Sequence, residues 1–527
     1  MNVPLTPLEF RRRAETLFGN KVGVVDGEKR FTYAEFGERS RRLAAAIRDA
    51  GVRPGEVVSF LTYNTHHLLE AYYGVLQAGA ILNPINIRLH PNDITYVLNH
   101  AESRALFFHK DFTPMVETIR PGLETVRRFV SVEPDGPPAF GDEYEALLAR
   151  ATPMREDPEV DEHGIAELFY TSGTTGRPKG VALTHRSLYL HALYAIIGKG
   201  DTDASVMLHI VPMFHVNGWG APHTITALGG THVMLRKIDP VEIFRLIQKE
   251  HVTELRGVPA IFNALVNHPD LGRYDLRSLR LAMSGGAPPA PALVKAIIDK
   301  LGCEMFVGYG LTETSPVLTL ARPKAHLSHE SPERQLERRA RTGYAILGVE
   351  VRVVDENGRD VPADGEAVGE IVTHSNVVMD GYFKDPQATA AAIRDGWFHT
   401  GDMANIDSEG YVNIVDRKKD IIISGGENIS SVQIENALYA HPAVFECAVI
   451  PVPDEKWGEV PKALVVLKPG AAAGEADILA HCRERLAGFM MPKSVEFLDA
   501  LPKGGTGKIL KAQLRDRYWA GQERPVH

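Results

Sequence analysis

Cysteine is scarce in this sequence of 527 residues. The only three, Cys303, Cys447 and Cys482, are far apart and form no CxxC pair and no Cys/His ligand spacing. A cysteine-based zinc site and a disulfide scaffold are therefore not expected, and a reducing compartment is favoured.

Long apolar runs are also missing. No segment approaches the ~18 uninterrupted apolar residues of a membrane-spanning helix. The N-terminus has acid and proline where a signal peptide needs an apolar run, and the C-terminus is not a Ser-Lys-Leu peroxisomal address. We expect a soluble, cytoplasmic protein.

Positive charge is in deficit, with a formal net charge of −9. This balance argues against general nucleic-acid binding, which favours basic faces, but it allows one small basic pocket. Otherwise the composition is that of a globular protein, with 44% hydrophobic and 24% charged residues. The chain is too long for one ordinary core, so two or more domains are expected.

The first part of the chain alternates strand-like and helix-like patterns. Val57–Leu61 is a short apolar run, and residues 66–80 carry apolar side chains at helical spacing. This rhythm predicts an α/β fold in which parallel or mixed sheets are flanked by helices. Further strand signals lie at Ala105–Phe108, Phe129–Val132, Val206–Val211 and Leu281–Ser284.

The pattern changes near residue 349. Val349–Asp355 alternates, a turn signal follows, and Gly369–Thr373 and Tyr411–Asp416 suggest further strands. We therefore expect a small β-barrel-like subdomain at about 345–416. The next ~105 residues predict a compact α+β unit, with helices at about 432–439 and 476–486 and strands at 445–451 and 463–467. The predicted division is an N-terminal domain, 1–418, and a mobile C-terminal domain, 419–527.

Residues 328–341 predict a charged helix. Ser331 is a suitable N-cap, and Glu330/Arg334 and Glu337/Arg341 have i,i+4 spacing. A solvated connecting helix is the favoured interpretation. The alternative is a basic face toward a nucleotide tail or a second subunit, and a homodimer stays open.

A hydroxyl- and glycine-rich segment, Thr171–Gly180, follows the apolar run Ala166–Phe169. Its glycines allow close approach to an anion, its hydroxyls donate hydrogen bonds, and its lysine adds charge, which together suit a polyphosphate. It is not the GxxxxGK[ST] motif, because a glycine follows the lysine. The candidate nucleotide-binding residues here are Thr171, Ser172, Gly173, Thr174, Thr175, Gly176 and Lys179.

With this segment and several motifs in order downstream, the chain resembles the acyl-adenylate-forming superfamily over nearly its whole length. Val211–Trp219 and the inserted segment before Gly343 look most like bacterial fatty-acyl-CoA synthetases and related acyl-CoA ligases. The resemblance implies an acid–thiol ligase that uses ATP, Mg²⁺ and coenzyme A. It would activate a carboxylic acid, a medium- or long-chain fatty acid, as acyl-AMP and then form the CoA thioester, releasing AMP and pyrophosphate.

The resemblance also assigns residues around the nucleotide. The strand end at 284–288 would lie against adenine, Tyr309 would stack on it, and Glu313, with Thr174, would hold Mg²⁺. Without the resemblance, the Thr312–Glu313 pair could simply cap a helix. The further residues at this part of the site are Gly285, Gly286, Ala287, Gly308, Gly310 and Thr312.

Four more positions follow from the resemblance. Asp402 would bind the ribose hydroxyls, Arg417 the ribose or phosphate region, and Lys508 would be the catalytic lysine of adenylation. Lys419 matches the hinge about which the small domain turns between an adenylating and a thioester-forming pose. The pantetheine of CoA would contact a second loop, Ser424, Gly425, Gly426 and Glu427, where Glu427-Asn428 replaces the Glu-Trp of the nearest fatty-acyl relatives.

For the acyl group, the resemblance places His215 beside the carboxylate and Trp219 at the mouth of a fatty-acid tunnel. Val216 and its neighbours are apolar, and Gly310 also faces the substrate. The absence of an aspartate from this stretch counts against an amino-acid substrate. The proposed catalytic residues are Lys508, Thr174, His215 and Glu313.

Several alternatives stay open. The adenylate could pass to a carrier-protein pantetheine or be oxidised, and the acid could be an aryl or short-chain one. A non-catalytic nucleotide sensor is a further alternative, against which the intact motifs argue.

Overall fold

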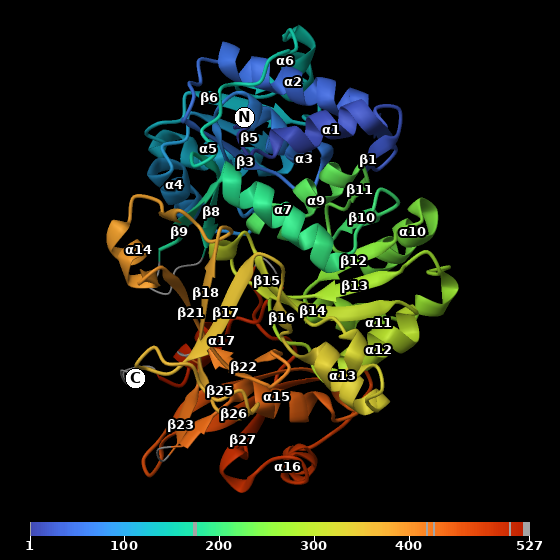
Figure 1. Ribbon diagram of the computed structural model, residues 1–527, viewed down its shortest axis with the longest axis vertical. Coiled ribbons are helices and arrows are strands. Elements are labelled where there is room, and N and C mark those ends of the chain that lie inside the picture. Colours follow the sequence, from blue (N-terminus) through green and yellow to red (C-terminus); the bar gives the residue numbers. More distant parts are fainter. Residues whose placement is uncertain (1, 172–176, 418–419, 425–426, 505–506, 520–527) are drawn as a thin grey trace.

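The computed structural model describes residues 2–171, 177–417, 420–424, 427–504 and 507–519. Its N-terminal part is built on two large sheets, followed by a curled antiparallel sheet and a C-terminal α+β unit (Figure 1). The expected α/β class is confirmed. Within the described ranges, no helix is long and apolar enough to cross a membrane.

The first large sheet is mainly parallel, in the order β19-β9-β8-β4-β3-β5-β6-β7. Its central strand β3 is buried along its whole length, as expected of a strand covered on both faces. The strand β9 returns antiparallel beside β8. The strands are β3 (Val57–Leu61), β4 (Ile81–Pro84), β5 (Ala105–His109), β6 (Arg128–Val132), β7 (Asp142–Glu143), β8 (Ile165–Thr171), β9 (Lys179–Thr184) and β19 (Gly381–Tyr382).

The second large sheet has the order β16-β15-β14-β13-β12-β10-β11-β1-β2. Its interior is parallel, and antiparallel pairs occur only at its two edges. The strands are β1 (Val22–Asp26), β2 (Lys29–Thr32), β10 (Val206–His209), β11 (Thr231–Met234), β12 (Glu254–Gly257), β13 (Leu281–Ser284), β14 (Glu304–Gly310), β15 (Val317–Leu320) and β16 (Tyr344–Ala345).

Most helices between and around the two sheets share one buried core, whereas α4 packs in a second cluster. Two tyrosines of α3 join the sheets: the hydroxyl of Tyr72 donates to the carbonyl oxygen of Met213 at 2.6 Å, and Tyr73 donates to that of Pro222 at 2.9 Å. The main helices are α1 (Leu8–Phe18), α2 (Tyr33–Asp49), α3 (His66–Gln77), α4 (Pro91–His100), α6 (Tyr144–Arg150), α7 (His185–Lys199), α9 (Ala221–Leu228), α10 (Pro240–Glu250), α11 (Pro259–Val266) and α12 (Pro291–Leu301).

The curled antiparallel sheet confirms the β-rich region expected after residue 345. Its strands pair in the order β17-β18-β21-β20, and β22 pairs with β21. The last strand runs from Val412 to Arg417, one residue later than predicted at each end. The elements are β17 (Val349–Val354), β18 (Gly369–Ser375), α14 (Pro386–Ala392), β20 (Ile393–Arg394), β21 (Trp397–Ile406) and β22 (Val412–Arg417).

The C-terminal unit has a separate buried core. Its long hairpin pairs Val444 with Leu467 and Asp454 with Gly458, so both strands are longer than predicted. Prolines and charged residues near the turn hid this extension from an apolar-run criterion. The boundary near 417–420 stays a prediction, and Lys419 lies outside the described residues. The elements are β23 (Ile422–Ser424), β24 (Glu427–Ile429), α15 (Ser431–Tyr439), β25 (Val444–Asp454), β26 (Gly458–Leu467), α16 (Glu475–Arg483), β27 (Ser494–Phe497) and α17 (Lys511–Asp516).

The charged helix is present as α13 (Pro332–Ala340), but its predicted ion pairs are wrong. Glu330 precedes the N-cap and binds Arg338 at 2.7 Å instead of Arg334. Arg341 lies beyond the helix end and binds Asp407 at 2.6 Å, instead of Glu337. Both i,i+4 expectations failed because one member of each pair lies outside the helix.

Candidate active site

The segment predicted to bind phosphate lies between two paired strands. Thr171 ends β8, Lys179 begins β9, and the two residues pair across the strands. The predicted residues between them, Ser172, Gly173, Thr174, Thr175 and Gly176, lie outside the described part of the chain. The strand pair therefore fixes the two ends of this segment on a rigid sheet.

Tyr382 links this hairpin to Glu313, and it was not predicted. The Nζ of Lys179 lies 5.0 Å from the centre of the Tyr382 ring, and the Tyr382 hydroxyl donates to Oε1 of Glu313 at 2.9 Å. Burial raises the pKa of Glu313. No sequence motif marked Tyr382, which reaches this place because β19 pairs with β9.

Tyr309, Asp402 and Arg417 come together from three strands, β14, β21 and β22. The Tyr309 hydroxyl donates to Oδ2 of Asp402 at 2.8 Å, and Nε of Arg417 lies 3.1 Å from Oδ1. Asp402 is buried and directly opposite Arg417 in the strand pairing. Burial raises the pKa of Tyr309, and the Asp402 carboxylate raises that of Arg417. These contacts join the residues predicted for adenine and ribose.

The glycines predicted beside adenine are required by close packing. A β-carbon at Gly285 would lie 2.9 Å from the Gly308 carbonyl oxygen and 3.1 Å from the Trp219 ring. One at Gly310 would lie 1.6 Å from the carbonyl oxygen of Pro316. Trp219, predicted for the acyl group, thus packs directly on the strand end predicted for adenine. Ala287 follows Gly286 in the same loop, and Thr312 is buried at the start of a short 3₁₀ turn.

The segment after His215 is a left-handed turn. Its five consecutive residues, Val216 to Gly220, all have positive φ, from 31° to 79°. Each non-glycine residue in this conformation costs roughly 1–2 kcal/mol, so the surroundings must hold it. The Nδ2 of Asn217 donates to Oε2 of Glu167 at 3.1 Å, and its Oδ1 accepts the Gly220 N–H at 2.7 Å.

Glu167 is a buried carboxylate on β8 that was not predicted. Besides Asn217, it binds Nε2 of His223 at 2.7 Å. It therefore connects the strand that leads into the phosphate-binding segment with the turn that carries His215 and Trp219. Its only sequence signal is a single acid inside the apolar run Ala166–Phe169.

Lys508 approaches this group from the C-terminal unit. A β-carbon at the neighbouring Gly507 would lie 3.1 Å from Val258, which itself lies beside Gly286. Desolvation and then Arg417 lower the pKa of Lys508 to about 8, although solvent reduces this effect because the residue is exposed. Burial and then Lys508 lower the pKa of His215 to about 4. Lys508 is thus within electrostatic reach of Asp402 and Arg417, which are predicted for the ribose, and of His215, which is predicted for the acid.

The predicted CoA loop is in a different place on the C-terminal unit. Ser424 and Glu427 pair with each other across the β23–β24 hairpin, and Ser424 also pairs with Gly458. Glu427 is exposed. Gly425 and Gly426 lie outside the described residues. The structure therefore brings Lys508 close to Asp402 and Arg417. Ser424 and Glu427 have their strand partners within the C-terminal unit.

Comparison with known families decides what this arrangement belongs to. A family model described as AMP-binding enzyme matches residues 10–383, and one described as AMP-binding enzyme C-terminal domain matches residues 433–508. The chain belongs to the AMP-binding enzyme family. The predicted resemblance and the prediction of an AMP-forming acid–thiol ligase are confirmed.

The relatives of this AMP-binding enzyme act on different acids. It is 42% identical to a long-chain-fatty-acid–CoA ligase of Thermus thermophilus (98% of this chain, 96% of the relative) and 39% identical to a peroxisomal benzoate–CoA ligase of Arabidopsis thaliana (98% and 93%). Its fold matches a crystal structure of the anthranilate CoA ligase AuaEII with anthranoyl-AMP, with a TM-score of 0.91, 26% identity and 98% of each chain covered.

Proposed function

We propose that this enzyme activates a carboxylic acid as acyl-AMP and transfers the acyl group to coenzyme A. The observation that carries the proposal is the contact of Tyr309 and Arg417 with Asp402, with Lys508 within electrostatic reach of this group and of His215. Aromatic, acidic and basic side chains at one place suit a nucleotide that must react at its α-phosphate with a bound acid.

In the first step, a carboxylate oxygen attacks the α-phosphorus of ATP, and the bond from that phosphorus to the bridging oxygen of pyrophosphate breaks. Tyr309 offers a ring face to adenine, and Asp402 accepts hydrogen bonds from the ribose. The ammonium of Lys508 stabilises the negative charge that develops between the carboxylate and the phosphate. Neutral His215 can donate one hydrogen bond to the acid without attracting a second anion.

In the second step, the thiol sulfur of CoA attacks the acyl carbon, AMP leaves with the electron pair, and the thiol proton is released. Ser424, Gly425, Gly426 and Glu427 would line the pantetheine. These residues reach the acyl-AMP by rotation of the domain 419–527 about Lys419 against the domain 1–418. The chemistry needs positioning and charge stabilisation more than covalent help from the protein.

The site also suits Mg²⁺ on the ATP phosphates. Oε1 of Glu313 accepts the Tyr382 hydroxyl, and this single contact leaves carboxylate lone pairs that a cation could use. Burial raises the pKa of Glu313, and the charge of a nearby divalent ion would lower that pKa again. Glu313 and Thr174 would hold the ion, which neutralises phosphate charge when bound.

For the acid, we favour a medium- or long-chain fatty acid, since Val211, Met213, Phe214 and Val216 around His215 are buried and apolar. The second candidate is a shorter or aromatic acid, which the packing of the Trp219 indole on Gly285 favours by narrowing the available space. AMP release with CoA should be measured for acetate, butyrate, octanoate, palmitate and benzoate. The highest kcat/KM with octanoate or palmitate supports the first candidate, and with benzoate or butyrate the second.

The acceptor can be tested in the same assay. Acyl-CoA formation with CoA alone supports the proposal. AMP release that needs a pantetheine-bearing carrier protein would favour carrier loading instead, and no pyrophosphate release with any acid would favour a nucleotide sensor. The cytoplasmic location and the homodimer stay predictions.

A further inference from the structure

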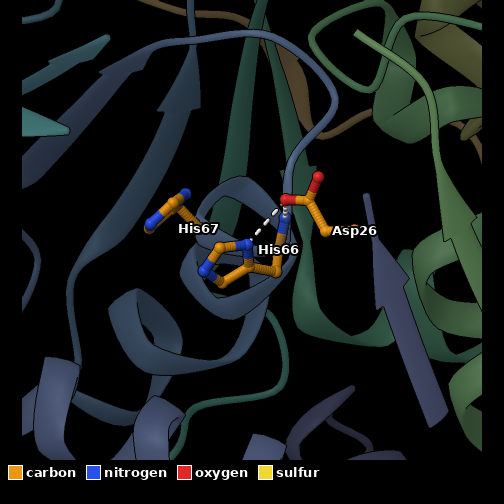
Figure 2. Close-up of side chains that lie close together, drawn as sticks. All are labelled: Asp26, His66 and His67. Atoms are coloured by element: carbon orange, nitrogen blue, oxygen red, sulfur yellow. Dashed lines mark hydrogen bonds and ion pairs between the residues drawn. The ribbon is translucent and has the colours of Figure 1, made fainter. Parts of the chain in front are cut away.

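A second cluster of titratable side chains lies where β1 and α3 meet, in the upper half of Figure 1, while the nucleotide group lies on β14, β21 and β22. Candidate ligand atoms of Asp26, His66 and His67 all lie within 4.8 Å of one another, and the three residues are buried. Figure 2 shows the two rings side by side, with His66 bound to Asp26.

Asp26 fixes the orientation and tautomer of His66. Its Oδ2 accepts the His66 backbone N–H at 3.1 Å and the ring Nδ1–H at 2.6 Å. This carboxylate also offsets the partial positive charge at the start of α3. With the proton on Nδ1, the lone pair of Nε2 is free, and this buried atom has no hydrogen-bond partner among the described residues. An aspartate behind a histidine in this way is the usual support of a metal-ligating imidazole.

His67 is even less satisfied. Within the described part of the chain, both of its buried ring nitrogens lack a hydrogen-bond partner. Its ring lies edge-on to Tyr144 with centroids 4.8 Å apart. An imidazole left without partners in the interior costs free energy unless something else binds it.

Glu145 supplies a third donor from the first turn of α6. Its Oε1 lies 3.4 Å from Nε2 of His67 and 3.9 Å from Nε2 of His66. Ligands about 2.0–2.1 Å from a tetrahedral zinc ion are roughly 3.3 Å from one another. The His67–Glu145 pair already has this spacing, and Nε2 of His66 would have to approach Oε1 of Glu145 by about 0.6 Å. The Glu145 side chain is 45% exposed, which gives an ion a route from solvent and leaves room for a water ligand.

The charges around the cluster also favour a cation. Four carboxylates, Asp26, Glu70, Glu133 and Glu145, face two arginines, Arg39 and Arg236. Lys29 reaches Glu133 only from the surface, at 3.6 Å. Counting these carboxylates and arginines alone, the interior group has two negative charges in excess, which a divalent ion would balance.

We propose that His66, His67 and Glu145 bind a divalent transition-metal ion of the zinc class, with Asp26 as the positioning residue behind His66. The site uses no cysteine. Two imidazoles and one carboxylate are a donor set that zinc and cobalt accept, with one coordination position left open.

The test is titration of the metal-free, full-length protein with Zn²⁺ by calorimetry, and with Co²⁺ by visible absorption. We expect one ion per chain and the intense absorption of four- or five-coordinate Co²⁺. Glu145→Gln and His67→Gln each remove a proposed ligand and should weaken metal binding by more than about 100-fold. Asp26→Asn removes only the carboxylate that orients His66 and should weaken it by about 10-fold. Unchanged ATP–pyrophosphate exchange, with Mg²⁺ supplied, verifies that each variant is folded.

The control is His481→Gln, because His441 and His481 form another close histidine pair, with centroids 4.9 Å apart. This variant should bind as the parent does. Absence of a 1:1 site in the parent overturns the proposal, and so does equal binding by Glu145→Gln and the parent, which would mean surface histidines alone hold the ion. Loss of metal binding in Glu145→Gln, together with intact ATP–pyrophosphate exchange, supports the site independently of the acyl-CoA ligase activity.

Discussion

The C-terminal unit presents two loops with opposite surroundings. Lys508 lies within electrostatic reach of Asp402, Arg417 and His215, whereas Glu427 is exposed and pairs only within its own hairpin. The loop of Lys508 therefore faces the residues predicted to bind the nucleotide, whereas the described residues of the other loop, Ser424 and Glu427, pair with strands of the C-terminal unit. The difference supports a division of labour in which each half-reaction uses one loop, and it can be tested one loop at a time.

The largest effect is expected from Lys508→Ala. Removing the ammonium should lower acid-dependent ATP–pyrophosphate exchange by at least about 100-fold, the usual loss when a transition-state charge partner is deleted. Thioester formation from supplied acyl-AMP should change little. The two half-reactions should be measured separately on the same preparation, and equal loss of both would disprove the assignment.

The pH dependence of adenylation tests whether the charge on Lys508 is needed for this half-reaction. Desolvation and then Arg417 lower the pKa of Lys508 to about 8, an effect that solvent reduces because the residue is exposed. The charged form is the active one, so exchange should fall as pH rises through a midpoint between about 8 and the ordinary lysine value, roughly tenfold per unit above it. His215, with a pKa of about 4, stays neutral throughout and adds no second limb in this range.

Lys508→Arg is the control for this profile. An arginine keeps its charge throughout this range, so the fall should vanish even though the absolute rate is lower. A fall that persists in the arginine variant would assign the titration to another group.

Lys419→Pro addresses the passage between the two loops. A proline fixes one backbone angle and removes a donor, which should restrict rotation at the proposed hinge. We expect the overall rate to fall about tenfold, with thioester formation affected more than adenylation. An unchanged overall rate, measured by CoA-dependent AMP release, would remove the hinge from the mechanism.

The sequence predicted the chemistry-bearing residues better than the residues that position them. Thr171, Tyr309, Asp402 and Lys508 stand in short motifs whose glycines and polar residues are unusual in combination. The assignments given to them remain proposals, although Tyr309 and Asp402 do come together and Lys508 lies within electrostatic reach of Asp402. The fold was readable because buried strands and amphipathic helices leave a period in the sequence.

Positioning residues leave no such signal. Glu167, Tyr382 and Asp26 are single polar residues within or beside ordinary strands, and only pairing between distant segments gives them partners. The ion pair of Arg341 has the same origin: it lies beyond the end of α13 and binds Asp407, which is far along the chain, instead of Glu337. Tertiary contacts of this kind cannot be read from local patterns.

The smallest expected effect concerns one of the contacts between β22 and the C-terminal unit. Oδ2 of Asp416, on β22, accepts the backbone N–H of Ser431 at 2.8 Å and its hydroxyl at 2.6 Å, and Lys511 binds the same hydroxyl. These contacts cross the predicted boundary. Asp416→Asn should weaken them by about 1 kcal/mol and shift the balance of poses by about fivefold.

Adenylation by Asp416→Asn should therefore fall by up to that factor, while thioester formation from acyl-AMP is unchanged or faster. The matched control is Arg515→Gln, which breaks the 3.0 Å ion pair with Asp420. Both of its members follow the proposed hinge, so the ratio of the two half-reactions should match the parent. If Asp416→Asn also leaves that ratio unchanged, the Asp416 contact only stabilises the fold, and the exposure of the Glu427 loop must be explained without a shift of pose.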